Sequence, residues 1–145
     1  MKENLRLDNQ LCFRLYSASR LLTQAYHPLL SGFGLTYSQY LVLMVLWEKD
    51  AQPVNDIARK LLLETNTVTP MLKRMEASGL VTRRRSKEDG RQVVVTLTDK
   101  GRALEDKLSC VPDEIGGMLV CNSLNSETAP GLFMVLDEII QRLKH

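Results

Sequence analysis

The hydrophobic positions in the middle of the chain repeat with the period of an α-helix. They follow the spacing i, i+3, i+4, i+7 between residues 66 and 77, so they share one helix face. Pro70 restricts the start of this helix because proline has no N–H to donate, and Gly79 suits its C-terminal end. We therefore expect a helix that begins near Asn66 or Thr67 and buries one side. The buried side consists of Val68, Met71, Leu72 and Met75.

The opposite face of this helix carries polar groups of a kind that binds a nucleic-acid groove. Short hydrogen-bonding side chains stand near its N-terminal end, and two cations follow them. An ordinary surface helix has the same distribution, so the neighbouring elements must decide between the two interpretations. The candidate DNA-binding residues on this face are Asn66, Thr67, Thr69, Pro70, Lys73 and Arg74.

Two other helices are predicted on the N-terminal side of this one. Thr36 and Gln39 have the spacing of a capping box, which indicates a helix from residue 37 to about residue 47. Apolar residues at helical spacing predict another helix over residues 54–61, and a short connection over residues 62–64 follows it. Two short amphipathic helices joined by a tight turn form a helix-turn-helix, which supports the DNA-binding interpretation.

A β-hairpin is predicted directly after the helix-turn-helix. Residues 81–85 and 93–97 contain β-forming valine and threonine, and an Asp-Gly turn signal lies between them. This arrangement is the wing of a winged helix. Its tip presents Arg91 and Lys87, and the negative potential of a narrow minor groove attracts an inserted arginine. Asp89 is expected to orient Arg91 through a charge-assisted hydrogen bond.

Apolar stripes run along both terminal segments of the chain. A helix is predicted from Leu5 to about Leu30, and its apolar residues recur at alternating spacings of four and three. This spacing is the seam of helices that pack along each other. Residues 132–143 form another long apolar face. So long a helix at a terminus seldom finds enough core within a small domain, which favours a homodimer with interlocking terminal helices over a monomer with a long core helix. The N-terminal seam consists of Leu11, Leu15, Ala18, Leu22, Ala25 and Leu29.

The predicted fold is therefore mainly α (α+β), with a winged helix-turn-helix over residues 35–111. Residues 1–34 and 112–145 are expected to form a helical dimerisation region of the same structural domain. Thr98 caps the helix that follows the wing. The pattern leaves open whether residues 112–125 form a separate helix.

The composition is typical of a folded protein, with 44% hydrophobic and 25% charged residues. The net charge is only +2, but residues 73–102 contain nine Lys or Arg against four Asp or Glu. Basic charge is thus concentrated beside the predicted DNA-binding helix. No apolar run approaches the length of a membrane span, and the N-terminal ten residues are too charged for a signal peptide. We therefore expect a cytoplasmic protein that does not contact a membrane.

Three cysteines, Cys12, Cys110 and Cys121, are widely spaced, and the chain has only two histidines. This spacing does not match a zinc motif, so we expect no metal site and no cofactor. A free cysteine is commonly buried as a small hydrophobic group, and the position of Cys12 in the N-terminal helix is compatible with that role.

The order of the predicted elements resembles the MarR family of bacterial transcription regulators over nearly the whole chain. The Asp-Gly-Arg motif at residues 89–91 and the Leu-Thr-Asp-Lys-Gly segment at residues 97–101 carry this resemblance. Two further segments are similar to the organic-hydroperoxide sensors of the OhrR type within that family. They are Leu-Asp-Asn-Gln-Leu-Cys-Phe at residues 7–13 and the helix segment at residues 67–76.

The resemblance implies a homodimeric repressor that leaves double-stranded operator DNA when organic hydroperoxides oxidise Cys12. It also implies that Tyr16, Tyr26 and Tyr37 support the Cys12 thiolate, which is the form that attacks a peroxide. Tyr16 lies one helical turn from Cys12. Tyr26 lies fourteen residues away, about 21 Å along a helix, so it must reach Cys12 from the partner chain.

Some sensors of this type carry a second, resolving cysteine in the C-terminal half. The resemblance makes Cys121 and Cys110 the candidates, with Cys121 beside a polar linker and therefore the more mobile of the two. Both a one-cysteine mechanism and a disulfide with Cys12 remain open from the sequence.

Three other functions fit parts of the pattern. A MarR-type regulator can respond instead to a small aromatic or lipophilic ligand, in which case Cys12 is incidental. A thiol peroxidase would turn over peroxide at Cys12, but no arginine or threonine partner for turnover is evident, so we expect no enzyme. A plain protein-interaction module would bind no DNA even at low salt.

Overall fold

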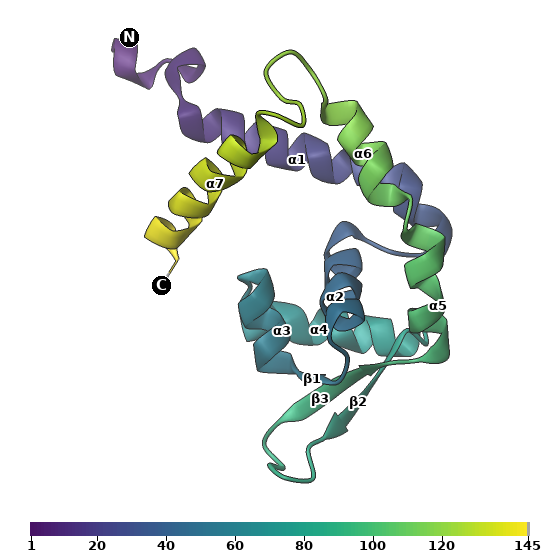
Figure 1. The fold of residues 1–145 in the computed structure, drawn as a ribbon. Coiled ribbons are helices and arrows are strands. Elements are labelled where there is room, and N and C mark those ends of the chain that lie inside the picture. Colours follow the sequence, from purple (N-terminus) through teal and green to yellow (C-terminus); the bar gives the residue numbers. More distant parts are fainter. Residues whose placement is uncertain (145) are drawn as a thin grey trace. The chain divides into compact units, whose positions relative to one another are not determined.

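The computed structural model describes residues 1–144 and is mostly helical, with one small antiparallel sheet (Figure 1). Its helix-turn-helix and hairpin confirm the predicted fold class. In chain order the elements are α1 (Leu11–Leu30), α2 (Tyr37–Glu48), β1 (Gln52–Pro53), α3 (Val54–Leu61), α4 (Thr65–Ala77), β2 (Val81–Arg85), β3 (Val93–Leu97), α5 (Asp99–Leu108), α6 (Val111–Leu119) and α7 (Ala129–Leu143), with short 3₁₀ turns at Glu3–Leu5, Leu7–Asn9 and Ser31–Phe33.

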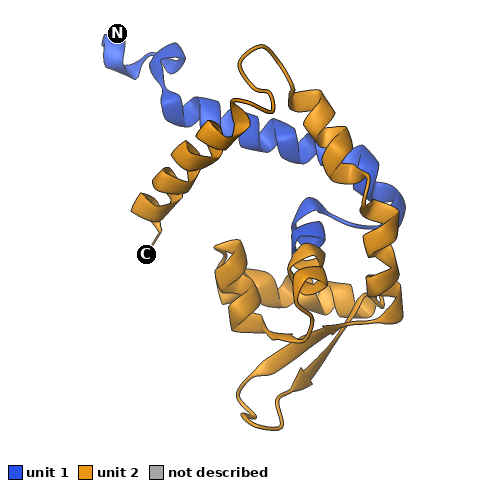
Figure 2. Cartoon of the chain, viewed as in Figure 1, with its two compact units in different colours: residues 1–41 blue, residues 42–145 orange. Residues whose placement is uncertain are grey.

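The chain forms two compact units, Met1–Leu41 and Val42–His145 (Figure 2). Unit 1 contains α1 and the first residues of α2. Unit 2 contains the rest of α2 and all later elements. The boundary lies inside α2, so this helix belongs to both units.

The first helix begins later than the sequence predicts. α1 begins at Leu11, not at Leu5, because residues 3–5 and 7–9 form 3₁₀ turns closed by backbone hydrogen bonds between residues three apart. The helix then runs without interruption to Leu30.

The capping box predicted at the start of α2 is confirmed. The backbone N–H of Gln39 donates to Thr36 Oγ1, and the backbone N–H of Thr36 donates to Gln39 Oε1, both at 3.2 Å. Within residues 1–144 no single helix is both long and apolar enough to cross a membrane. One bent pair, residues 11–33 with residues 37–48, meets the same length and composition criteria when its two parts are combined.

The helix-turn-helix consists of α3 and α4, as predicted. α4 begins at Thr65, slightly before the expected start, so Pro70 lies inside the helix. Its missing N–H leaves the Asn66 carbonyl without the usual intrahelical bond. Gly79 ends the helix in a left-handed conformation with φ of 76°, which glycine adopts without strain. The predicted inner face is confirmed, because all four of its residues are buried: Val68, Met71, Leu72 and Met75.

The sheet has the strand order β1-β3-β2, and both strand pairs are antiparallel. The two longer strands have the predicted bounds, with Val81 opposite Leu97 and Arg85 opposite Val93. The sequence pattern does not predict β1. This strand has only two residues, one of them Pro53, so it is too short to show any alternation.

A glycine allows α5 to pack closely against the turn between α4 and β2. A Cβ atom at Gly101 would overlap the backbone carbonyl of Leu80 and crowd the side chain of Leu97. Thr98 caps α5 as predicted, since its Oγ1 accepts from the backbone N–H of Gly101 at 3.1 Å. Trp47 Nε1 donates to the Gly101 carbonyl at 3.0 Å, which ties α2 to the same place.

The segment after α5 contains a separate helix, which answers a question that the sequence leaves open. α6 has Pro112 in its first turn, where the missing N–H would have no intrahelical partner. α7 has no buried residue, and α1 also leaves large apolar side chains exposed. The exposed apolar residues of these two helices are Leu11, Phe13, Leu15, Tyr16 and Leu21 on α1, and Leu132, Phe133, Met134, Val135, Ile140 and Leu143 on α7.

Candidate functional site

The polar face of α4 is open to solvent, as a groove-binding surface requires. Lys73 and Arg74 form no ion pair with the part of the chain that the structure describes, so both cations are available to DNA. Thr69 is half-buried, and its hydroxyl donates to the Thr65 carbonyl at 2.9 Å. The other predicted residues of this face are exposed: Asn66, Thr67 and Pro70.

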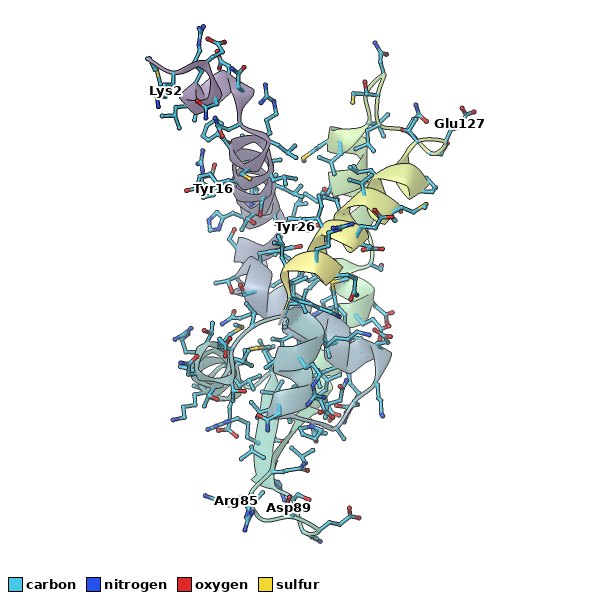
Figure 3. All side chains as sticks on the ribbon, turned by 90° about the vertical axis from the view of Figure 1, so that its left-hand side faces the viewer. Lys2, Tyr16, Tyr26, Arg85, Asp89 and Glu127 are labelled. Atoms are coloured by element: carbon cyan, nitrogen blue, oxygen red, sulfur yellow. The ribbon has the colours of Figure 1, made fainter. Side chains whose placement is uncertain are left out.

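Hydrogen bonds within the loop hold the tip of the wing. Arg85 Nη1 donates to the Gly90 carbonyl at 2.9 Å, and the Ser86 hydroxyl accepts from the backbone N–H of Asp89 at 3.3 Å. Figure 3 shows Arg85 and Asp89 together at this end of the hairpin. The tip is therefore braced before any DNA binds.

The contact between Asp89 and Arg91 differs from the one predicted. Asp89 Oδ1 accepts from the backbone N–H of Arg91 at 3.0 Å, and the two side chains form no ion pair. The short side chain of an aspartate in a turn commonly accepts from the backbone N–H two residues ahead. This local hydrogen bond replaces the predicted contact with the Arg91 guanidinium. Arg91 and Lys87 are both exposed, and their charged groups remain available.

One contact between α4 and the wing is not apparent in the sequence. Glu76 Oε2 accepts from the backbone N–H of Arg83 at 2.9 Å, and Glu76 Oε1 accepts from Arg83 Nη2 at 3.2 Å and Nε at 3.3 Å. The backbone hydrogen bond, together with the Arg83 guanidinium, lowers the pKa of Glu76. The pair fixes β2 against the C-terminal half of α4. Glu76 and Arg83 lie on opposite sides of the turn between α4 and β2, so neither helix nor strand periodicity predicts their contact.

Cys12 is exposed in the first turn of α1. Tyr16 follows one turn later and is 63% exposed. Asn9 and Gln10, the two residues before this helix, have a structural role in the sequence motif around Cys12. The carboxamides of Asn9 and Gln10 each donate, at 2.8 Å, to a backbone carbonyl of the preceding 3₁₀ segment. These bonds hold the non-helical segment beside the start of α1.

Tyr26 of α1 and Tyr37 of α2 pack together, with ring centroids 4.5 Å apart. Tyr40 completes the cluster at 5.8 Å from Tyr26 and 6.3 Å from Tyr37. Burial raises the pKa of both Tyr26 and Tyr37, and Tyr37 raises the pKa of Tyr26 further, so both phenols stay protonated and can donate. Tyr40 was not among the predicted sensor residues, although its spacing of three from Tyr37 places both on one helix face.

The long helix divides the predicted sensor residues into two groups. Cys12 and Tyr26 stand fourteen residues apart on the uninterrupted α1, about 21 Å along its axis. Tyr16 and Tyr26 accordingly lie at different levels of this helix (Figure 3). Within one chain, α1 therefore keeps Cys12 away from the cluster that contains Tyr26 and Tyr37.

The sequence is similar to those of known transcriptional regulators. The family model of the transcriptional regulator SarA/Rot matches residues 24–108, more than half of the chain. The chain is 52% identical over 112 residues to the HTH-type transcriptional regulator TtmR of Methylorubrum extorquens (strain PA1). That match covers 77% of this chain but only 57% of TtmR, so the chain spans less than two thirds of TtmR.

A second relative is the organic hydroperoxide resistance transcriptional regulator of Bacillus subtilis (strain 168). The chain is 47% identical to it over 116 residues, which cover 80% of this chain and 79% of the relative. The chain belongs to the SarA/Rot family of transcriptional regulators, whose model it matches, together with this relative. The predicted membership of the MarR family, with its organic-hydroperoxide sensors, is thereby confirmed.

Solved structures of AbfR, a protein of Staphylococcus epidermidis, resemble this regulator closely. Reduced AbfR bound to DNA has a TM-score of 0.79 at 43% identity, with 97% of this chain and 96% of that chain covered. Overoxidized AbfR bound to DNA has a TM-score of 0.79 at 45% identity, with 99% and 98% covered. Disulfide-formed AbfR has a TM-score of 0.65 at 45% identity, with 97% and 94% covered.

All three cysteines of the regulator are free and exposed. Cys110 lies between α5 and α6, and Cys121 lies in the connection before α7, where its backbone N–H donates to the Leu124 carbonyl at 2.9 Å. Among residues 1–144, no group of three or more His, Cys, Asp or Glu is placed to hold a metal ion.

Unit 1 of the regulator contains a partly open cavity of about 290 Å³. It lies between the last turns of α1 and the start of α2. Sites for drug-sized ligands usually measure ~300–1,000 Å³, so this cavity suits only a small compound. Its lining consists of Thr23, Gln24, His27, Leu35, Thr36 and Tyr37.

Proposed function

We propose that the protein is a homodimeric cytoplasmic repressor that binds double-stranded operator DNA and leaves it when organic hydroperoxides oxidise Cys12. One observation carries the proposal: an exposed cysteine stands in the first turn of α1, in a chain closely related to an organic hydroperoxide resistance regulator. No turnover of peroxide is part of the proposal.

DNA binding is assigned to the polar face of α4 and to the wing. α4 enters the major groove, where its short polar side chains meet base edges and its cations meet phosphates. The wing enters the adjacent minor groove. A solved structure of reduced AbfR bound to DNA supports DNA binding by this fold. The assigned residues are Asn66, Thr67, Thr69, Pro70, Lys73 and Arg74 on α4, with Lys87, Asp89 and Arg91 on the wing.

Dimerisation is assigned to the terminal helices, over residues 1–34 and 112–145, while residues 35–111 bind DNA. The exposed apolar side chains of α1 and α7 support this division, because a second copy would remove them from water. An antiparallel pairing of two α1 helices would also bring Cys12 of one chain to Tyr26 and Tyr37 of the other. Light scattering should give the mass of a dimer.

The sensing step is an ordinary two-electron oxidation of a thiolate. The Cys12 sulfur attacks one peroxide oxygen, the O–O bond breaks, and the departing alkoxide takes up a proton to become an alcohol. Cys12 becomes a sulfenic acid. Hydroxyl donors such as Tyr16, Tyr26 and Tyr37 stabilise the thiolate before attack and the alkoxide as it leaves.

DNA binding before and after peroxide treatment tests the proposal. Wild-type protein and Cys12→Ser should bind the same pseudo-palindromic duplex, with an affinity that falls steeply with salt. tert-Butyl hydroperoxide should release only the wild type. Release of Cys12→Ser by the peroxide would refute the role of Cys12. A sensor should also consume about one peroxide per Cys12 and stop, whereas a thiol peroxidase would continue with a thiol reductant.

A resolving cysteine is favoured by one comparison. AbfR has been solved on DNA in an overoxidized state and separately in a disulfide-formed state. A disulfide between Cys12 and Cys121 or Cys110 is therefore the form of oxidation that we assign to DNA release. Cys121→Ser and Cys110→Ser separate the two partners on non-reducing gels. An oxidised protein that has left the DNA with only Cys12 modified would rule out the disulfide mechanism.

The cavity of unit 1 favours a second candidate function, regulation by a small aromatic or lipophilic compound. Its lining combines the Tyr37 ring with hydrogen-bonding groups such as His27 and Thr23. Benzoate or a similar acid should then raise the melting temperature of Cys12→Ser protein and weaken its DNA binding. Absence of both effects removes this candidate.

A further inference from the structure

A second cavity lies in unit 2, between the helix-turn-helix and the wing. Its volume is about 170 Å³, and it is formed where the first turns of α3 and α4 meet the loop and strands of the hairpin. The lining includes two arginines and contains no carboxylate. Its polar members are Asn55, Thr65, Thr69, Arg83, Arg91 and Gln92.

Two helices begin at this cavity. α3 starts at Val54 and α4 at Thr65, and both residues belong to the lining. Neither Pro53 nor Glu64, the residues before these helices, forms a side-chain cap. The backbone N–H of Thr67 donates to the Glu64 carbonyl, but no cap side chain takes up the N–H groups before it. The positive ends of two helix dipoles add to the charge of the arginines.

Two lining side chains outside the predicted DNA-binding set, those of Arg83 and Asn55, are already held in place. Glu76 binds the Nε and Nη2 atoms of Arg83, whereas Nη1 has no partner among the described residues. Asn55 Oδ1 accepts from the Thr65 hydroxyl at 3.2 Å, which leaves the Asn55 amide group free to donate. A cation and an amide donor are thus presented to the cavity without further ordering.

We propose that this cavity binds one backbone phosphate of the DNA, with Arg83 and Asn55 as phosphate-binding residues. The inference rests on the proposed DNA-binding function. A sugar-phosphate strand separates the major groove from the minor groove. A protein with α4 in one groove and its wing in the other must accommodate that strand between them. Phosphate oxygens only accept hydrogen bonds, and this lining offers donors and cations.

An isosteric charge change tests the site. Asn55→Asp keeps the oxygen that accepts from Thr65 but places a carboxylate beside the phosphate. We expect affinity to fall at least about tenfold, because like charges at hydrogen-bond distance repel strongly. The loss should be equal for a duplex selected from a random pool and for a shuffled duplex, because phosphates carry no sequence. Asn122→Asp, with the same charge change outside the cavity, is the matched control and should bind nearly as the wild type.

The salt dependence of binding supplies an independent measurement. The double variant Glu76→Gln with Arg83→Gln removes the cation without leaving an unpaired carboxylate. The slope of log affinity against log salt should become shallower by about 0.9 for each lost phosphate contact, or about 1.8 for a dimer. Circular dichroism verifies that the variant is folded.

The possible outcomes separate this inference from the proposed function. Wild-type affinity in Asn55→Asp, or an unchanged slope in the folded double variant, overturns the phosphate site alone. A loss confined to the selected duplex also overturns it, because that result indicates base reading. Failure of the wild-type protein to bind any duplex at low salt overturns the proposed function itself.

Discussion

The phenol rings of Tyr26 and Tyr37 lie 4.5 Å apart, one contributed by α1 and the other by α2. In the proposed dimer this pair meets Cys12 of the partner chain. Tyr26→Phe and Tyr37→Phe keep the ring contact and remove one hydroxyl donor each. We expect each change to slow oxidation of Cys12 about tenfold, the effect of one lost hydrogen bond of roughly 1.4 kcal/mol.

Stopped-flow kinetics with tert-butyl hydroperoxide measures this rate directly. The reduced variants should bind DNA as tightly as the wild type, because neither hydroxyl belongs to the DNA-binding surface. Wild-type rates in both variants would remove the tyrosines from the mechanism.

The ion pair of Glu76 and Arg83 predicts an acid-dependent part of the stability. The pKa of Glu76 is lowered from its usual 4.5, mainly by the Arg83 backbone N–H. The contribution of the Glu76 carboxylate to the free energy of unfolding is therefore fully present above the pKa of Glu76 in the unfolded chain. It is lost as pH falls through the lower pKa of Glu76 in the folded protein. Glu76→Gln should be less stable than the wild type at neutral pH, and the difference should shrink below pH 4.5.

Urea unfolding at several pH values between about 3 and 7 checks this dependence. A difference between wild type and Glu76→Gln that stays constant across this range would show that the carboxylate charge contributes nothing. Lys100, which donates instead to the Ser78 carbonyl at the end of α4, gives a control variant, Lys100→Met. Its effect should not change over the acid range.

The close approach at Gly101 predicts a large loss of stability from one methyl group. Gly101→Ala forces Cβ into the Leu80 carbonyl, which is backbone and cannot move aside as a side chain can. We expect a loss of about 1–3 kcal/mol, typical of overpacking. Gly116→Ala, in α6, meets no atom within 4 Å and should be neutral or stabilising by up to about 1 kcal/mol. Equal effects at both glycines in urea unfolding would contradict the packing argument.

The braced wing predicts that substitution of either Arg91 or Asp89 weakens DNA binding, for two different reasons. Arg91→Ala should weaken DNA binding about tenfold or more and reduce the salt slope, because it removes a cation from the groove. Asp89→Ala should also weaken binding although it removes a negative charge, since it releases the backbone N–H of Arg91. Tighter binding by Asp89→Ala in fluorescence anisotropy would show that charge, not the shape of the turn, determines the contribution of Asp89.

Local sequence signals predicted most of the fold because each acts over a few residues. The capping box of Thr36 and Gln39, the left-handed Gly79 and the Thr98 cap all lie where their spacing indicated. The start of α1 was misplaced because Leu5 and Leu7 extend the apolar pattern toward the N-terminus, while Asn9 and Gln10 divert the backbone into 3₁₀ turns. In this segment the hydrogen bonds from side chains to the main chain determine the backbone conformation more strongly than the apolar periodicity does.

Contacts between distant segments were not predictable in the same way. The Glu76–Arg83 pair and the approach of Gly101 to Leu80 depend on how α4, β2 and α5 come together, and no repeat records that. Tyr40, by contrast, was predictable, because helical spacing places it on the same face of α2 as Tyr37. The position of Asp89 was predicted, but its hydrogen bond goes to the main chain of Arg91 rather than to the guanidinium.

Release of DNA and oxidation of Cys12 can be followed in the same sample. Reduced protein bound to labelled DNA is titrated with tert-butyl hydroperoxide, and each sample is divided between fluorescence anisotropy and mass spectrometry of the peptide that contains Cys12. If Cys12 is the sensor, the DNA-bound fraction should fall in step with the oxidised fraction of Cys12. Release of DNA while Cys12 remains a thiol would contradict the role of Cys12 as the sensor. So would DNA that stays bound after Cys12 has been fully converted to its disulfide.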